Sequence, residues 1–220
     1  MARQNKSHAV MSQRTEPKRS RDPFPTHPWA TRALIEHVLG SKAALATMSC
    51  WEPACGQGYM SKVLWEYFRE VRSSDIYPDG YGEVSDFLSH QPQLRTVDWV
   101  ITNPPFRLAE EFILKALQIA RVGVAMLVRT QFVETIGRYE RLFSSQPPTF
   151  IAPFVQRVPL LRERLDEKAS SATSYAWFVW RRSERQSTTT LLWIPPCRDE
   201  LKRTDDYELP TAHQQIELAA

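Results

Sequence analysis

A tetrapeptide of uncommon composition, Asn103-Pro104-Pro105-Phe106, joins a carboxamide, two prolines and an aromatic ring. It follows the apolar segment 96–102, where a strand must end because proline cannot donate to the hydrogen-bond ladder of a sheet. Proline also keeps the residue before it extended, so the Asn103 amide and the Pro104 carbonyl point to one place. Two acceptors beside a flat ring suit a neutral planar amine. The alternative interpretation is structural, a strand stop followed by a core phenylalanine.

A glycine-containing loop, EPACGQG at 52–58, lies between an apolar run and a helix-like segment. Glycine lets the backbone pass close to a ligand, and open parallel sheets bind ligands at the carboxyl ends of their strands. The loop therefore indicates a nucleotide-type cofactor. It does not match a dinucleotide fingerprint, because no third Gly or Ala follows Gly58 at the required spacing, and Glu52 would repel a pyrophosphate but suits a cation. The alternative is a plain glycine turn.

Two acidic residues follow the next expected strands. Asp75 comes about 20 residues after the glycine loop, where a carboxylate can accept from both hydroxyls of a ribose. Asp86 stands near the end of an expected third strand, with its carboxylate suited to an adenine amino group and Phe87 beside it to flank the ring. Each has a plainer alternative, a turn residue at Asp75 and a helix N-cap at Asp86.

The segments around these residues alternate between helix-like and strand-like patterns. Helical spacing is found after Pro28 and over 108–120, whereas 45–51, 96–102 and 122–128 are apolar runs of strand length. Such alternation predicts an α/β fold with a doubly wound, mostly parallel sheet. Three strand-like segments without a long helix between them predict an antiparallel edge; they are 150–158, 175–180 and 191–194.

Composition limits the class of protein. The chain has 220 residues, of which 42% are hydrophobic and 24% charged, so it can bury a sizeable core. Apolar runs stay well below the roughly 20 residues of a membrane span, and the first residues are too polar for a signal peptide. We therefore expect a cytoplasmic protein without a membrane partner. Cys50, Cys55 and Cys197 form no CxxC pair, so we expect neither disulfides nor a metal site.

Charge divides the chain into three parts. The whole chain carries +3, but residues 1–23 hold six basic and two acidic side chains. We expect 1–23 to be a disordered basic arm, which either lies along a polyanion or is a plain solvated tail. Residues 24–197 would then form the folded domain, and 198–220 an acidic, poorly ordered tail.

Five segments in the order PTHPWAT, EPACGQG, SDIYP, SDFL and NPPF resemble the class I S-adenosylmethionine-dependent methyltransferases. The resemblance is to the amino-methyltransferases that make N6-methyladenine, and especially to small phage- or prophage-type members. MLVRTQFVE, PFVQRVP and YAWFVWRR look like their later strands, so the resemblance covers residues 24–195. It implies a Rossmann-like sheet of seven strands and S-adenosyl-L-methionine as the cofactor.

The resemblance also implies roles for individual residues. The loop 52–58 would contact the methionine part of the cofactor, Asp75 the ribose, and Asp86 with Phe87 the adenine, while 26–31 would close over the methionine end. The implied cofactor-binding residues are Thr26, Trp29, Glu52, Pro53, Ala54, Gly56, Gly58, Asp75, Ile76, Asp86, Phe87 and Asn103. The implied catalytic residues, which would hold the target amine, are Asn103, Pro104, Pro105 and Phe106.

The substrate and the activity keep alternatives. Nucleic acid is the expected partner, with DNA favoured and RNA possible, although a Pro-Pro-aromatic segment also occurs in enzymes that methylate RNA bases or protein glutamine. The stretch between Asp86 and Asn103 is too short for a separate target-recognition domain. An alternative of another class is a catalytically silent, cofactor-binding module that binds nucleic acid or a partner protein. The sequence does not indicate an oligomeric state.

Overall fold

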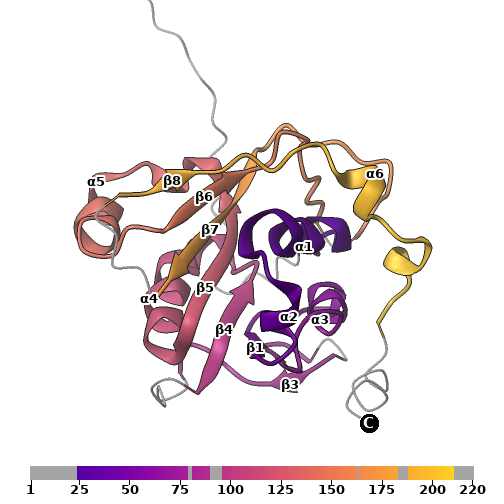
Figure 1. Ribbon diagram of the computed structural model, residues 1–220, viewed down its shortest axis with the longest axis horizontal. Helices are drawn as coiled ribbons and strands as arrows, with labels where there is room; N and C mark the ends of the chain where they lie inside the picture. The colour runs from indigo at the N-terminus through magenta and orange to yellow at the C-terminus, as the bar shows by residue number, and fades with distance from the viewer. Residues whose placement is uncertain (1–23, 79–80, 90–95, 163, 183–187, 211–220) are drawn as a thin grey trace, which may run out of the picture.

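A central sheet with helices on both faces makes up the fold (Figure 1). The computed structural model describes residues 24–78, 81–89, 96–162, 164–182 and 188–210. The strands are β1 Ser49–Glu52, β2 Glu70–Asp75, β3 Glu83–Val84, β4 Val97–Thr102, β5 Ala120–Arg129, β6 Phe150–Pro153, β7 Tyr175–Arg181 and β8 Thr190–Leu191. The α-helices are α1 Pro28–Leu34, α2 Lys42–Leu45, α3 Tyr59–Leu64, α4 Ala109–Ile119, α5 Ile136–Arg138 and α6 Arg198–Leu201. The remaining helices are the π-helices η1 Ile35–Leu39 and η4 Tyr139–Phe143 and the 3-10 helices η2 Phe106–Leu108, η3 Thr130–Val133 and η5 Thr204–Tyr207.

The strand order is β3-β2-β1-β4-β5-β7-β6-β8. Strands β3, β2, β1, β4 and β5 are mutually parallel, and β7 runs antiparallel to both β5 and β6. This confirms the doubly wound, mostly parallel sheet with antiparallel pairing towards one edge. The expected count of seven strands is wrong for the described residues, because β8 adds an eighth strand that pairs parallel with β6.

The two faces of the sheet bury different core layers, because side chains alternate along each strand. On β4, Trp99 and Ile101 face the layer that contains α1 and α3, whereas Val100 faces the layer that contains α4. Leu127 and Met126 alternate in the same way on β5. Figure 1 shows α1 and α3 on one side of the sheet and α4 on the other. The central strands are thus held from both faces, and their carboxyl ends are fixed in space.

Two expected boundaries differ from the structure. The strand expected over 45–51 begins only at Ser49, because the Ser41 hydroxyl accepts from the Ala44 backbone N–H (3.3 Å) and caps a short helix through Leu45. The acidic segment after residue 197, expected to be poorly ordered, is structured up to Tyr207 by α6 and η5. Residues 1–23 and 211–220, the arm and the rest of the tail, lie outside the described residues.

A buried ion pair explains why the acidic segment folds back. Arg32 of α1 is 2% exposed, and its two terminal nitrogens donate to both carboxylate oxygens of Asp206 at 2.8 Å. Asp206 is 1% exposed, and Glu66 accepts from the other side of the same guanidinium at 2.7 Å. A bidentate contact of this kind fixes geometry as well as charge. The ion pair therefore fastens the segment 198–207 to α1.

We expect Asp206→Ala to lower the free energy of unfolding by about 3 kcal/mol, because it leaves a buried guanidinium short of one partner. Asp205→Ala is the matched control. Asp205 is exposed and pairs with Lys62, so its loss should cost less than about 1 kcal/mol. Urea denaturation of both variants measures the difference, and equal losses would contradict a fastening role for Asp206.

Candidate active site

The three sequence motifs meet where the strand order changes direction. The loop 52–58 follows β1, Asp75 ends β2, and Asn103 follows β4. Strand β1 lies between β2 and β4, with Glu52 opposite Ser73 in the register. The crevice at such a switch point, outside the carboxyl ends of the strands, is where open α/β sheets bind ligands.

Asp75 holds the glycine loop in place. Its carboxylate accepts from the backbone N–H of Gly56 at 2.9 Å and from that of Tyr77 at 3.0 Å. Gly56 has φ +49°, and a Cβ added there would meet open space. The backbone is therefore accessible on that side. Ile76, next to Asp75, is an exposed apolar side chain.

Gly58 faces an aromatic side chain that the sequence analysis missed. It has φ +85°, and a Cβ at this position would lie 2.4 Å from the ring of Tyr81. Only glycine fits there without a displacement of the ring. The thiol of Cys55 also donates to the Tyr81 carbonyl at 3.1 Å. An aromatic residue soon after the turn at Asp75 was the signal that could have found it.

Glu52 is a buried acid. It is 2% exposed, and its carboxylate accepts from the Ser61 hydroxyl, which also lies 2.7 Å from the Ser73 hydroxyl. Burial, reinforced by the charge of Asp75, raises the pKa of Glu52 to about 8. Of the next two loop residues, Pro53 is buried and Ala54 half-buried.

Asp86 and Phe87 have local structural partners. Asp86 accepts from the Leu88 N–H at 2.9 Å and from the Ser89 hydroxyl at 2.6 Å, which closes a turn and lowers the pKa of Asp86. Phe87 is 1% exposed, and its ring packs edge-on against Trp51 at 5.1 Å. Both side chains lie after β3, as expected, and their contacts with an adenine remain predictions.

Asn103 is oriented by the segment that precedes α1. Its side-chain amide nitrogen donates to the Phe24 carbonyl at 2.9 Å and to the Thr26 hydroxyl at 3.1 Å. Its carbonyl oxygen, Oδ1, is buried and has no hydrogen-bond partner among the described residues. Both donors are thus used within the protein, and an acceptor is left for something else.

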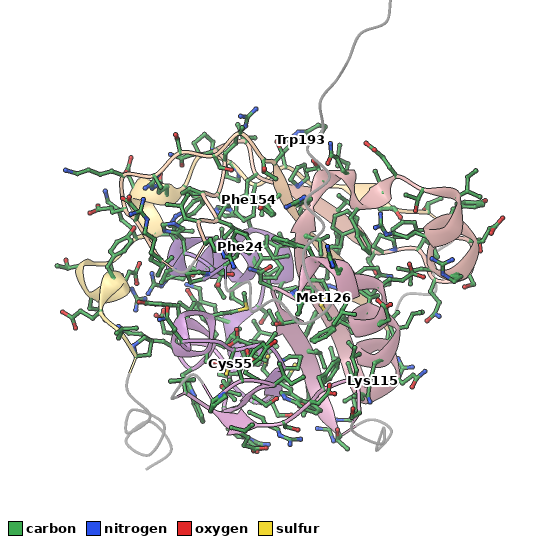
Figure 2. The ribbon with its side chains drawn as sticks, turned by 180° about the vertical axis from the view of Figure 1, so that it is seen from behind. Phe24, Cys55, Lys115, Met126, Phe154 and Trp193 are labelled. Atoms are coloured by element: carbon green, nitrogen blue, oxygen red, sulfur yellow. The ribbon has the colours of Figure 1, made fainter. Side chains whose placement is uncertain are left out.

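Trp29 lies deeper in the same segment. It is fully buried and packs edge-on against Phe154 at 5.6 Å, within the core layer of α1. Figure 2 shows Phe24 and Cys55 on the side of the sheet that carries this layer. Trp29 therefore has a packing role, and its expected cofactor contact remains a prediction.

Three side chains from other elements surround the ring of Phe106. The ring centroids of Phe24 and Tyr175 lie 5.3 Å and 5.9 Å away, and the guanidinium carbon of Arg129 lies 4.7 Å over the ring. Pro104 is buried and Pro105 exposed, so the tetrapeptide passes from the core to the surface. No sequence motif points to Phe24, Tyr175 or Arg129, because only the fold brings them to this ring.

Two solved structures share this architecture. A modification subunit assigned to a type I restriction enzyme from Vibrio vulnificus has a TM-score of 0.57 at 14% identity, over 89% of this chain and 51% of that one. A methyltransferase subunit of a type I restriction-modification system from Streptococcus thermophilus has a TM-score of 0.58 at 9% identity, over 90% and 52%. The chain has the class I methyltransferase fold.

No protein-family model matches the chain, and no curated protein matches it in sequence. The chain spans about half the length of the two solved structures.

In the described part of the chain, every helix is too short or too polar to cross a membrane. Across the same residues, no three His, Cys, Asp or Glu side chains gather as a metal site would require.

The raised pKa of Glu52 makes stability depend on pH. Between its ordinary value of 4.5 and the folded value of about 8, the folded state holds the proton more tightly, so the free energy of unfolding falls as pH rises. Burial lowers the pKa of His27 from 6.5 to about 4, which acts in the opposite direction below pH 6.5. Between pH 6.5 and 8, the change in the free energy of unfolding therefore comes from Glu52 and not from His27.

We expect Glu52→Gln to remove much of the loss of stability between pH 6.5 and 8. Urea denaturation at several pH values, for the variant and the wild type, measures it. A decline of the same size in both proteins would show that Glu52 is ionised throughout this range in the folded chain.

Proposed function

We propose that the protein is an S-adenosylmethionine-dependent methyltransferase that acts on an exocyclic amine of a nucleobase, with N6 of adenine in DNA as the favoured target. The observation that carries this proposal is the orientation of Asn103. Its amide nitrogen is occupied by Phe24 and Thr26, and its buried Oδ1 is left as an acceptor at the carboxyl end of β4. An amine with two N–H groups is the complement of such an acceptor.

The residues around the glycine loop fit the cofactor. Gly56 presents its backbone to open space, Asp75 is an acid at the end of β2, and Glu52 is a further acid beside the loop. When bound, S-adenosylmethionine supplies an electrophilic methyl group on a sulfonium. The loop 52–58 and Thr26 would hold its methionine part, Asp75 its ribose, and Ile76, Asp86 and Phe87 its adenine.

The protein's part in the reaction is to position and polarise the amine. An exocyclic amine conjugated to a ring is a poor nucleophile, because its lone pair is delocalised. Asn103 Oδ1 and the Pro104 carbonyl oxygen would accept hydrogen bonds from the two N–H groups of the amine. These hydrogen bonds favour the pyramidal amine of the transition state. Their geometry is fixed beforehand by the proline backbone and by Thr26, so little reorganisation is needed.

A nucleobase fits the remaining features better than a glutamine side chain does. A base inside a duplex cannot reach this site, so it must leave the stack, and Phe106 offers a flat surface for it. A glutamine amide would use the same two acceptors but not the ring. An RNA base would use both the acceptors and the ring, and it remains the nearest alternative.

Cys50, Cys55 and Cys197 are free thiols, which fits the proposed location in the reducing cytoplasm.

We expect Asn103→Ala to lower the rate of methyl transfer by about 100-fold or more, the scale of losing one preorganised hydrogen-bonding partner. Thr26→Val should lower it less, because Asn103 stays present but loses one of the two contacts that orient it. Radioactive methyl transfer to DNA and RNA measures both, with circular dichroism as the check on folding. Wild-type rates in Asn103→Ala would leave the tetrapeptide as a strand stop only.

We expect Asp75→Ala to weaken binding of S-adenosylhomocysteine by about 1–3 kcal/mol, because ribose hydroxyls would lose their acceptor. The substitution also frees the Gly56 N–H, so the loop becomes less ordered at the same time. Calorimetry measures the affinity. Titration with NAD in the same way tests whether the site takes a dinucleotide instead. Unchanged affinity in a folded variant would return Asp75 to the role of a turn residue.

A further inference from the structure

Three side chains cover the ring of Phe106. Tyr175 is 3% exposed within β7, and Phe24 is half-buried with its carbonyl bonded to Asn103. Arg129 differs from both, because its side chain is exposed and has a long flexible stem. A base that stacks on Phe106 can therefore displace Arg129 more readily than either aromatic ring, because both rings are held in place by packing.

Arg129 also stands apart from the other arginine of its strand. Arg121, near the opposite end of β5, pairs with Asp98 at 3.0 Å. Arg129 ends β5 on the side of the site, and no carboxylate among the described residues pairs with it. Its planar cation rests on the Phe106 ring at 4.7 Å and also donates a hydrogen bond to the Tyr175 hydroxyl. Both partners are neutral groups, so the positive charge of Arg129 remains available to an anion.

We propose that Arg129 is a phosphate-binding residue that occupies the stacking face of Phe106 until the target base takes it. When a base enters, the guanidinium leaves the ring and pairs with a backbone phosphate of the nucleic acid. The guanidinium suits both partners, since it is flat enough to stack on a ring and offers a fork of donors to phosphate oxygens. This inference rests on the proposed function, because it assumes a nucleobase at Phe106.

The pairing with phosphate is tested by the salt dependence of binding. Removal of one cation that neutralises a phosphate should reduce the slope of log K against log salt by about 0.9 on duplex DNA and about 0.7 on a single strand. We expect that reduction in Arg129→Gln, and a wild-type slope in Arg129→Lys, which keeps the charge. Arg121→Gln is the matched control, since it removes the same charge from the far end of the same strand.

The displacement is tested separately by nuclear magnetic resonance. Protons that lie over an aromatic ring resonate upfield, so the proton signals of the Arg129 side chain should be shifted upfield in the protein alone. They should return to ordinary positions when the protein is saturated with an oligonucleotide. Arg129→Lys assigns the signals, and Phe106→Ala should abolish the upfield shift. Signals that stay upfield in the saturated complex would overturn the exchange of partners.

The outcomes separate this inference from the proposed function. Methyl transfer by the wild type is measured on the same oligonucleotides, with S-adenosylmethionine added. If transfer occurs but Arg129→Gln and Arg121→Gln keep the wild-type slope, the phosphate role of Arg129 is wrong and the proposed function stands. If the wild type transfers no methyl group to nucleic acid, the proposed function fails. If the wild-type protein binds no oligonucleotide, both the proposed function and the role of Arg129 fail.

Discussion

The site depends on one interaction, the pair of hydrogen bonds that fix the Asn103 amide to the segment before α1. The Phe24 carbonyl and the Thr26 hydroxyl take the two N–H groups of Asn103, and the direction of Oδ1 follows from this. The interaction exists only if α1 stays where it is. The burial of α1 in its core layer keeps it there, and the ion pairs of Arg32 with Asp206 and Glu66 add to this. Core packing and a salt bridge on the acidic segment thus both contribute to a neutral hydrogen bond at the end of β4.

The sheet supplies the second constraint. Because β1 lies between β2 and β4, the glycine loop, Asp75 and Asn103 are neighbours although some fifty residues separate the first from the last. Core layers on both faces hold these strand ends. Two side chains cover parts of the site, since Tyr81 rests on Gly58 and Arg129 on Phe106. Gly58 and Phe106 are the residues proposed to contact the cofactor and the base, so a bound ligand would lie beside Tyr81 and Arg129.

The sequence predicted the fold class, the order of elements and the backbone positions of the motifs, because those follow from hydrophobic spacing and from Gly and Pro. It did not predict Tyr81, Tyr175 or Arg129, whose roles arise from contacts between distant segments. It was wrong about the acidic segment, since a charged stretch is typical of a solvated tail until a buried arginine pairs with it. Trp29 and Phe87 lie in packed layers, which shows how aromatic residues of a motif can serve the core.

The acceptor at Asn103 is proposed to serve an exocyclic amine of a nucleobase. The most direct measurement is mass analysis of nucleosides from DNA and RNA, together with peptides from protein, after incubation with the purified protein and deuterated S-adenosylmethionine. The account predicts a labelled methyl group on the exocyclic amine of a base, with N6-methyladenine in DNA as the favoured product. Label on glutamine alone, or on none of the three substrates, would contradict it.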